Sequence, residues 1–219
     1  MRYYPIHLNI QNRNCLVVGG GGVGTRKVIT LLKCSAKVTV VSPVISERLQ
    51  NLAESAPLTL KPRPYRTADL EGMFLVIGAT DDEQLNRQIS RDAECRNTLC
   101  NIADRPEICN FILPSIVQRD DLVITISTSG RSPALAKKMR KTLEKKFGEE
   151  YGDFLQLLGA IRNKLLSQAH EPEAHKPLFE QLINSDLIAM IREAKTEDIN
   201  AVLFNILGDG YRFEELMRS

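Results

Sequence analysis

A glycine-rich stretch decides the fold of this chain: it reads Val17-Val18-Gly19-Gly20-Gly21-Gly22-Val23-Gly24. Its G-x-G-x-x-G pattern falls on Gly19, Gly21 and Gly24, after an apolar run that predicts a strand and before a stretch that predicts a helix. In such a turn the first glycine permits a tight bend, the second lets a pyrophosphate approach the backbone, and the third lets the helix pack on the strand. The amides of Gly22 and Val23 then face the phosphates at the helix N-terminus. We therefore expect a dinucleotide site here rather than a merely flexible glycine loop.

Strands and helices alternate beyond this turn. Short apolar runs predict further strands at 38–41, 58–60, 74–77 and 99–102, and helical patterns lie at about 46–53 and 81–96. Strands that are apolar on both faces and alternate with helices are typical of a parallel sheet covered on both sides. The sequence therefore predicts an α/β fold whose N-terminal domain, residues 1–113, is a Rossmann-like parallel sheet.

The pattern changes after about residue 110. Apolar runs at 111–113 and 122–126 predict two strands, and the short polar link at 118–121 favours an antiparallel hairpin. Ser132 and Pro133 predict the start of a helix, because serine is a good N-cap and proline is favoured at the first helical position. From Tyr151 onward the spacing of apolar residues is helical. We expect a small α+β segment at 114–149 and an all-helical C-terminal domain at 150–219.

The composition excludes several classes of protein. The chain has 219 residues, of which 43% are hydrophobic and 26% charged, as is typical of a soluble globular protein. No apolar run reaches the roughly 18 residues of a membrane helix, and the first residues lack the apolar core of a signal peptide. With 29 basic and 27 acidic side chains, the net charge of +2 argues against a dedicated nucleic-acid binder.

Cysteine and histidine give no support to a metal site or a disulfide framework. The five cysteines are odd in number and form no Cys-x-x-Cys pair, so the simplest location is a reducing cytoplasm. His7 precedes the predicted sheet, while His170 and His175 lie in a polar linker predicted at 168–177. We expect all three histidines to be solvated surface residues, and we predict no metal ligand.

The end of the second predicted strand carries an unusual cofactor signal. An acidic residue at this point commonly binds the ribose hydroxyls of NAD, but the chain has Ser42-Pro43-Val44 there instead. Ser42 is placed to bond a ribose hydroxyl, and the turn at Pro43 and Val44 to pack against adenine. The turn that ends in Thr80, after the fourth strand, is expected to line the same crevice.

Asp104 is the best candidate for chemistry. It follows the fifth predicted strand in Asn101-Ile102-Ala103-Asp104, so it should emerge at the carboxyl edge where such sheets bind their ligands. A carboxylate there can serve as a general base, with Asn101 beside it toward the substrate. The alternative is a loop aspartate that caps a turn or pairs with Arg105.

A basic segment forms a second constellation. It begins with Ser127-Thr128-Ser129-Gly130-Arg131, and seven basic residues against one acid lie between positions 130 and 146. Hydroxyls, amides and a helix N-terminus can bind an anion, so we expect Ser127, Thr128, Ser129, Arg131 and Lys137 to face an anionic substrate or RNA. With only Phe147 as a nearby aromatic, stacking on nucleic-acid bases has little support. The alternative is an ordinary solvated helix face. Residues 114–149 carry 8 basic and 4 acidic side chains, whereas residues 150–219 carry 7 and 12, so the near-neutral total conceals a basic centre.

These motifs together resemble the siroheme synthase family of precorrin-2 dehydrogenases and sirohydrochlorin ferrochelatases. The resemblance begins in the opening of the chain and its glycine turn and covers about two-thirds of the sequence. Further motifs in the same order are Gly78-Ala79-Thr80-Asp81-Asp82, Cys100-Asn101-Ile102-Ala103-Asp104, Phe111-Ile112-Leu113-Pro114-Ser115 and Ser127-Thr-Ser-Gly-Arg-Ser-Pro-Ala-Leu-Ala136. The helical tail matches in character only.

The resemblance implies NAD-dependent oxidation of precorrin-2 to sirohydrochlorin, by a homodimer joined through the segment at 114–149. It implies that Asp104 is the essential aspartate and that Gly22, Val23, Pro43 and Val44 bind NAD. Insertion of Fe²⁺ or Co²⁺ is a second activity that the resemblance allows. A different class of protein, a non-catalytic NAD-sensing module that dimerises, remains as the alternative. For a chain that is complete at residue 219, without a methyltransferase domain, we expect precorrin-2 to be made elsewhere.

Overall fold

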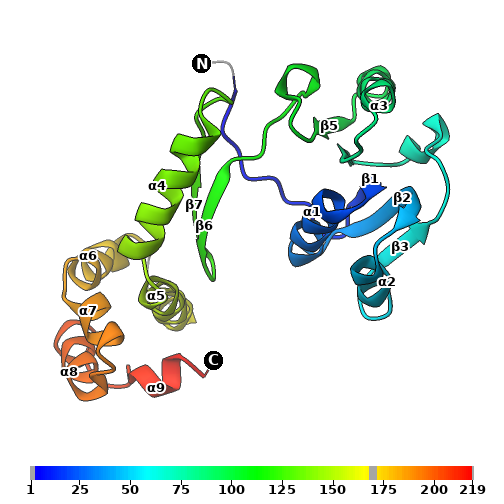
Figure 1. Cartoon of the computed structure of the whole chain (residues 1–219). Helices are drawn as coiled ribbons and strands as arrows, with labels where there is room; N and C mark the ends of the chain where they lie inside the picture. The colour runs from blue at the N-terminus through cyan, green and yellow to red at the C-terminus, as the bar shows by residue number, and fades with distance from the viewer. Residues whose placement is uncertain (1–2, 168–171, 219) are drawn as a thin grey trace. The chain divides into compact units, whose positions relative to one another are not determined.

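The chain forms two compact units in a computed structural model that describes residues 3–167 and 172–218 (Figure 1). The first unit comprises Met1–Leu113 together with Ser129–Arg131. The second comprises Pro114–Thr128 together with Ser132–Ser219. The hydrophobic cores of one unit share no residue with those of the other.

A five-stranded parallel sheet builds the first unit, as predicted. Its strands are β1 (Asn14–Gly20), β2 (Lys37–Ile45), β3 (Leu58–Lys61), β4 (Leu75–Gly78) and β5 (Leu99–Ile102). They are ordered β3-β2-β1-β4-β5, and all four pairings are parallel. All strands therefore end at one edge, and the order reverses between β1 and β4. In doubly wound sheets, ligands bind at that point.

Both faces of this sheet are covered because its side chains alternate. Cys15 and Val17 of β1 belong to one core, whereas Leu16 and Val18 belong to the other. The helices α1 (Gly22–Lys33) and α2 (Glu47–Ala53) cover the first face, and α3 (Glu83–Cys95) covers the second. The 3-10 turns η1 (Thr67–Leu70) and η2 (Pro106–Ile108) complete the unit. The apolar-on-both-faces pattern in the sequence thus predicted the correct architecture.

Strand β2 is longer than its apolar run predicted. It continues through Pro43 to Ile45 and pairs again with β1, after a shift of register between Val18 and Gly20. Glycine permits this second pairing, because a Cβ at position 20 would lie closer than 3.0 Å to the Val44 carbonyl oxygen. The expected cofactor turn at Ser42, Pro43 and Val44 is therefore part of an irregular strand.

The hairpin of the second unit lies further along the chain than expected. Its strands are β6 (Ser115–Arg119) and β7 (Leu122–Ile126), joined by Asp120 and Asp121. The predicted strand at 111–113 was wrong, because Phe111 packs against the core of the first unit instead. Its carbonyl oxygen accepts a hydrogen bond from the Asn101 side chain at 3.1 Å, which ties this stretch to β5.

Helices make up the rest of the second unit. They are α4 (Pro133–Lys146), α5 (Glu150–Ser167), α6 (Pro172–Ile183), α7 (Leu187–Arg192), α8 (Thr196–Leu207) and α9 (Phe213–Leu216). Ser132 caps α4 as predicted, accepting a hydrogen bond from the Leu135 amide at 3.2 Å. A core that includes Leu157, Ile161 and Leu203 joins α5 to the later helices. Within the described residues, no helix is both long and apolar enough to cross a membrane.

One histidine expectation fails. The linker predicted at 168–177 is helical from Pro172 onward, and His175 is buried at 6% exposure rather than solvated. Apolar residues further along α6 pack in the core of the helical unit and bring this turn of helix with them. The two prolines in this stretch of sequence had favoured a linker instead of a helix. His7 is exposed as expected, and His170 lies outside the described residues.

Candidate functional site

The glycine turn has the steric requirements of a dinucleotide-binding turn. Gly19 has φ +116°, a conformation that side chains rarely adopt. A Cβ at Gly24 would lie closer than 3.0 Å to the Gly19 carbonyl oxygen, so this glycine lets α1 pack tightly on β1. Sequence reasoning missed Gly20, whose close approach to β2 shows only in the three-dimensional pairing.

The remaining two glycines face open space. A Cβ at Gly21 or Gly22 would meet nothing within 4 Å. Gly21 is the N-cap of α1, and the first amides of a helix, including those of Gly22 and Val23, have no intrahelical partner. A diphosphate fits this cradle, because glycine leaves the backbone uncovered and the helix dipole favours negative charge.

Side-chain hydroxyls hold the cradle in shape. Thr25 donates to the Gly21 carbonyl oxygen at 2.9 Å, and its hydroxyl lies 3.0 Å from that of Ser46. The Ser46 amide donates in turn to the Gly20 carbonyl oxygen at 3.1 Å. These bonds connect the start of α1 to the loop after β2, so the phosphate and ribose sides of the turn are fixed to one another.

A cavity of about 350 Å³ lies beside this loop. Its lining residues are Pro43, Val44, Ile45, Gln50, Leu60 and Pro62. Val44 is 77% exposed, which leaves an apolar side chain available to a ring, whereas Ser42 is buried. This hollow is open and lined mostly by apolar side chains, among them Pro43 and Val44, which the sequence predicts to pack against adenine.

Thr80 organises the opposite side of the crevice. Its hydroxyl donates to the Asn86 side chain at 2.9 Å, and the Asn86 amide group donates back to the Thr80 carbonyl oxygen at 2.9 Å. Gly78 also matters here, because a Cβ at that position would meet Ile102 and Asn86. Thr80 thus shapes this turn through internal bonds.

Asp104 stands at the same edge of the sheet, in a tight turn after β5. It is exposed and has φ +60°, within a turn closed by the bond from the Arg105 amide to the Ile102 carbonyl oxygen at 3.3 Å. Aspartate tolerates this left-handed conformation better than most residues. Arg105 does not pair with Asp104 within 4 Å; it binds Glu83 of α3 at 3.3 Å and Glu107 at 3.8 Å. The Asp104 carboxylate is therefore presented to solvent at the carboxyl edge of the sheet.

Cys109 holds both ends of the Asp104 turn. Its thiol sulfur accepts from the Ile102 amide at 3.1 Å and lies 3.1 Å from the Arg105 carbonyl oxygen, to which the thiol donates. Burial raises the pKa of the Cys109 thiol, which keeps its donor proton in place. The sequence showed no signal for this role, since only the fold brings residue 109 back to residue 102.

Asn101 is buried at 8% exposure and supports the same region. Its side-chain amide donates to the Phe111 carbonyl oxygen, so part of its hydrogen-bonding capacity is already used. Ser129 and Arg131 also belong to the first unit, and a Cβ at Gly130 between them would lie 3.9 Å from Pro106. The segment at 129–131 therefore packs near the turn that follows Asp104.

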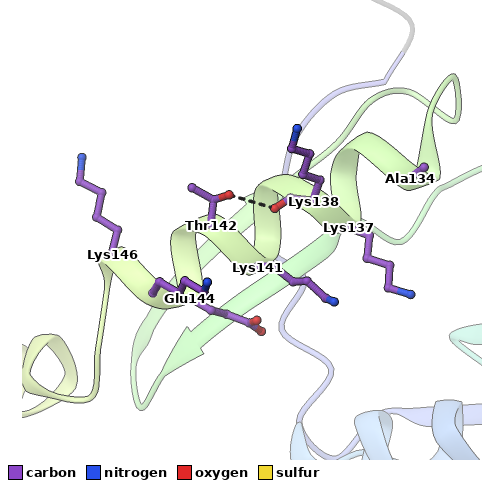
Figure 2. A pocket seen from close by; sticks show the side chains of 8 residues that line it. Ala134, Lys137, Lys138, Lys141, Thr142, Glu144 and Lys146 are labelled. Carbon is purple, nitrogen blue, oxygen red and sulfur yellow. Dashed lines mark hydrogen bonds between the residues drawn. The ribbon is translucent and has the colours of Figure 1, made fainter.

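The other expected substrate residues, Ser127, Thr128 and Lys137, belong to the second unit. The Thr128 hydroxyl accepts from the Ser132 amide at 3.2 Å and so helps to start α4. A shallow hollow of about 1070 Å³ runs along α4 (Figure 2). Its residues are Ala134, Lys137, Lys138, Lys141, Thr142, Glu144, Lys145 and Lys146. Since a single helix supplies them all, this hollow is an open basic surface.

Figure 2 shows how the lysines divide on this helix. Lys137 and Lys141, one turn apart, extend to the same side, whereas Lys138 extends to the other. The Thr142 hydroxyl donates to the Lys138 carbonyl oxygen at 3.2 Å. Among the described residues, no group of three or more His, Cys, Asp or Glu side chains is arranged to hold a metal ion.

Comparison with known proteins gives a consistent assignment. Residues 6–115 match the family model described as "Putative NAD(P)-binding", and residues 119–146 match the model described as "Sirohaem biosynthesis protein central". The siroheme synthase of Nitrosococcus oceani is 35% identical over 211 residues, which cover 96% of this chain and 45% of that protein. The siroheme synthase of Nitrosomonas europaea is 35% identical over 192 residues, covering 87% of this chain and 40% of that protein. The chain thus spans less than half the length of these relatives.

A solved structure extends the likeness to the fold. The protein titled "SirC, precorrin-2 dehydrogenase" superposes with a TM-score of 0.76 at 26% sequence identity. The match covers 91% of this chain and all of that structure. The match therefore includes the helical second unit. The sequence motifs had shown only that this part of the chain is helical, as in the family.

Proposed function

The chain belongs to the siroheme synthase family of NAD(P)-binding proteins, and from this premise we propose that it oxidises precorrin-2 to sirohydrochlorin with NAD⁺. One observation carries the proposal. An open glycine cradle for a diphosphate and an exposed carboxylate, Asp104, lie at the same carboxyl edge of one parallel sheet. Dehydrogenation needs both, because it removes a hydride and a proton from the substrate.

The chain's own residues divide these tasks. The amides of Gly22 and Val23 hold the diphosphate, while Pro43 and Val44 pack against adenine. When bound, the nicotinamide supplies the acceptor for the hydride. Asp104 takes the proton as general base and returns it to solvent, to which its exposed carboxylate has direct access.

The substrate carries many carboxylates, which gives the basic residues a partner. We assign Arg131 and Lys137 to substrate binding, together with Ser127, Thr128, Ser129 and Asn101. Lys137 and Lys141 form one positive side of α4, which supports this role (Figure 2). The five free thiols support a reducing compartment, and we place the reaction in the cytoplasm.

We further propose that two copies assemble through the segment at 114–149. Three large apolar side chains of this segment are exposed: Ile116 at 41%, Leu135 at 49% and Met139 at 43%. Leu135 and Met139 lie one turn apart on α4, and exposed apolar residues that gather on one element are typical of interaction sites. A second copy would cover them.

The test is direct. The purified chain, precorrin-2 and NAD⁺ are mixed without oxygen, and NADH and the tetrapyrrole spectrum are followed together. We expect one NADH for each sirohydrochlorin formed, since one hydride and one proton leave each substrate. NAD⁺ binding without NADH formation would instead identify the non-catalytic sensing module.

Metal insertion is a separate proposal. Fe²⁺ or Co²⁺ would enter as a substrate, and the macrocycle nitrogens would provide its ligands. With sirohydrochlorin and Fe²⁺, catalysis would appear as siroheme formation faster than in a mixture without protein. A rate equal to the uncatalysed one would limit the chain to dehydrogenation.

A further inference from the structure

Lys27 of α1 has no role in the site described so far. Its side chain is half-buried, although it carries a flexible, strongly hydrated ammonium group. Among the described residues, no carboxylate lies within 4 Å of its Nζ, since no ion pair includes it. A half-buried cation without a close partner costs free energy, which an anionic ligand can recover.

The contact that holds the start of α1 also determines which side of the sheet the Lys27 side chain faces. The Thr25 hydroxyl contacts Ser46, in the loop after β2, so the Thr25 flank of the helix faces the β2 side of the sheet. Lys27 lies two residues on, about 200° around the helix, and so on the opposite flank. Since the sheet order is β3-β2-β1-β4-β5, this flank faces β4 and β5.

The Lys27 side chain also points toward the carboxyl edge of the sheet, where Asp104 lies. Helical side chains lean toward the N-terminus of their helix, so the Lys27 stem extends from α1 toward the glycine cradle. Burial lowers the pKa of Lys27, Arg26 lowers it further, and the Asp104 carboxylate acts in the opposite sense. Lys27 is therefore within electrostatic reach of Asp104.

We propose that Lys27 is a substrate-binding residue that pairs with a carboxylate of the substrate and orients the ring over Asp104. This inference rests on the proposed function for the identity of the substrate, a polycarboxylate tetrapyrrole. Within the Rossmann-like unit, it adds a second cation to Arg131. An ammonium on one side of the crevice and Asp104 beside it would hold the substrate at two points, which fixes its orientation better than charge attraction alone.

The experiment compares Lys27→Gln with Arg26→Gln. Arg26 is the matched control, because it is the adjacent cation of the same helix but is exposed. Sirohydrochlorin binding, NAD⁺ binding and the kinetics of precorrin-2 oxidation are measured for each. We expect Lys27→Gln to weaken sirohydrochlorin binding and raise the KM for precorrin-2 about tenfold or more, with NAD⁺ affinity unchanged. Lys27→Arg should restore most of the affinity, and Arg26→Gln should change it less than twofold.

Two results would overturn the inference. If Lys27→Gln loses NAD⁺ affinity instead, the ammonium serves the dinucleotide. If both Gln variants lower sirohydrochlorin binding equally, only the overall positive charge matters. Failure of the proposed function is distinguishable from either result, because the wild-type chain itself would then form no NADH from precorrin-2 and NAD⁺.

Discussion

Asp104 combines a functional carboxylate with an unusual backbone conformation, and a test must separate the two. At φ +60°, asparagine is tolerated at least as well as aspartate, whereas alanine adds strain. We therefore predict that Asp104→Asn folds with unchanged NAD⁺ affinity but loses about 10²–10⁴-fold in kcat, the usual contribution of a general base. Asp120→Asn is the matched control, since Asp120 is also exposed and has φ +46°. An unchanged kcat in Asp104→Asn would remove Asp104 from the chemistry.

The glycines of the cradle should respond to alanine in two different ways. At Gly22 a Cβ meets only open space, so Gly22→Ala should leave the free energy of unfolding nearly unchanged but weaken NAD⁺ binding. At Gly24 a Cβ would collide with the Gly19 carbonyl oxygen, so Gly24→Ala should cost about 1–3 kcal/mol of stability, the usual range for overpacking. Urea unfolding and NAD⁺ titration of both variants measure the contrast. Equal destabilisation would contradict the assigned geometry.

The turn that presents Asp104 is an element built by its own internal bonds. We predict that Cys109→Ala lowers kcat with little change in NAD⁺ affinity, because the thiol joins the Ile102 amide to the Arg105 carbonyl oxygen. Each lost bond costs about 0.5–1.5 kcal/mol, so unfolding should shift only modestly. Cys109→Ser, which keeps a donor and an acceptor, should recover part of kcat.

The control for this element is Cys95→Ala, at an exposed thiol near the end of α3. It should alter neither kcat nor stability. A wild-type kcat in Cys109→Ala would show that backbone bonds and the Arg105–Glu83 pair hold the turn without the thiol.

Elements were predictable from sequence where local rules act alone. The strand–turn–helix unit followed from glycine spacing, and the start of α4 followed from the Ser132 cap. The hairpin was misplaced because Phe111 packs against the core of the first unit, and periodicity cannot show which core a run joins. Gly20 was missed because its role depends on the pairing of β1 with a distant part of β2. Cys109 was missed because its bonds to Ile102 and Arg105 form only when the chain turns back after β5.

At the scale of the whole molecule, the proposed dimer can be broken without touching the crevice of the first unit. Leu135→Glu places a charge on the exposed apolar stripe of α4. We predict a shift from dimer to monomer in sedimentation, because a charge opposite its own copy repels and is costly to desolvate. Phe204→Glu on α8 is the control, since Phe204 is equally apolar and 56% exposed. A dimer that persists in Leu135→Glu and dissociates in Phe204→Glu would move the interface to the second unit's later helices.

Two compact units whose hydrophobic cores share no residue predict two separable unfolding steps. NAD⁺ should stabilise only the unit that contains the glycine cradle, by about 2.7 kcal/mol when its concentration is 100 times the Kd. Leu203→Ala, in the fully buried core of the helical unit, should cost about 2–5 kcal/mol and lower the other step. Calorimetry with and without NAD⁺, on the wild type and on this variant, resolves the two. A single transition that NAD⁺ raises and Leu203→Ala lowers would mean that the units unfold together, because ligand binding at one core would then stabilise the other.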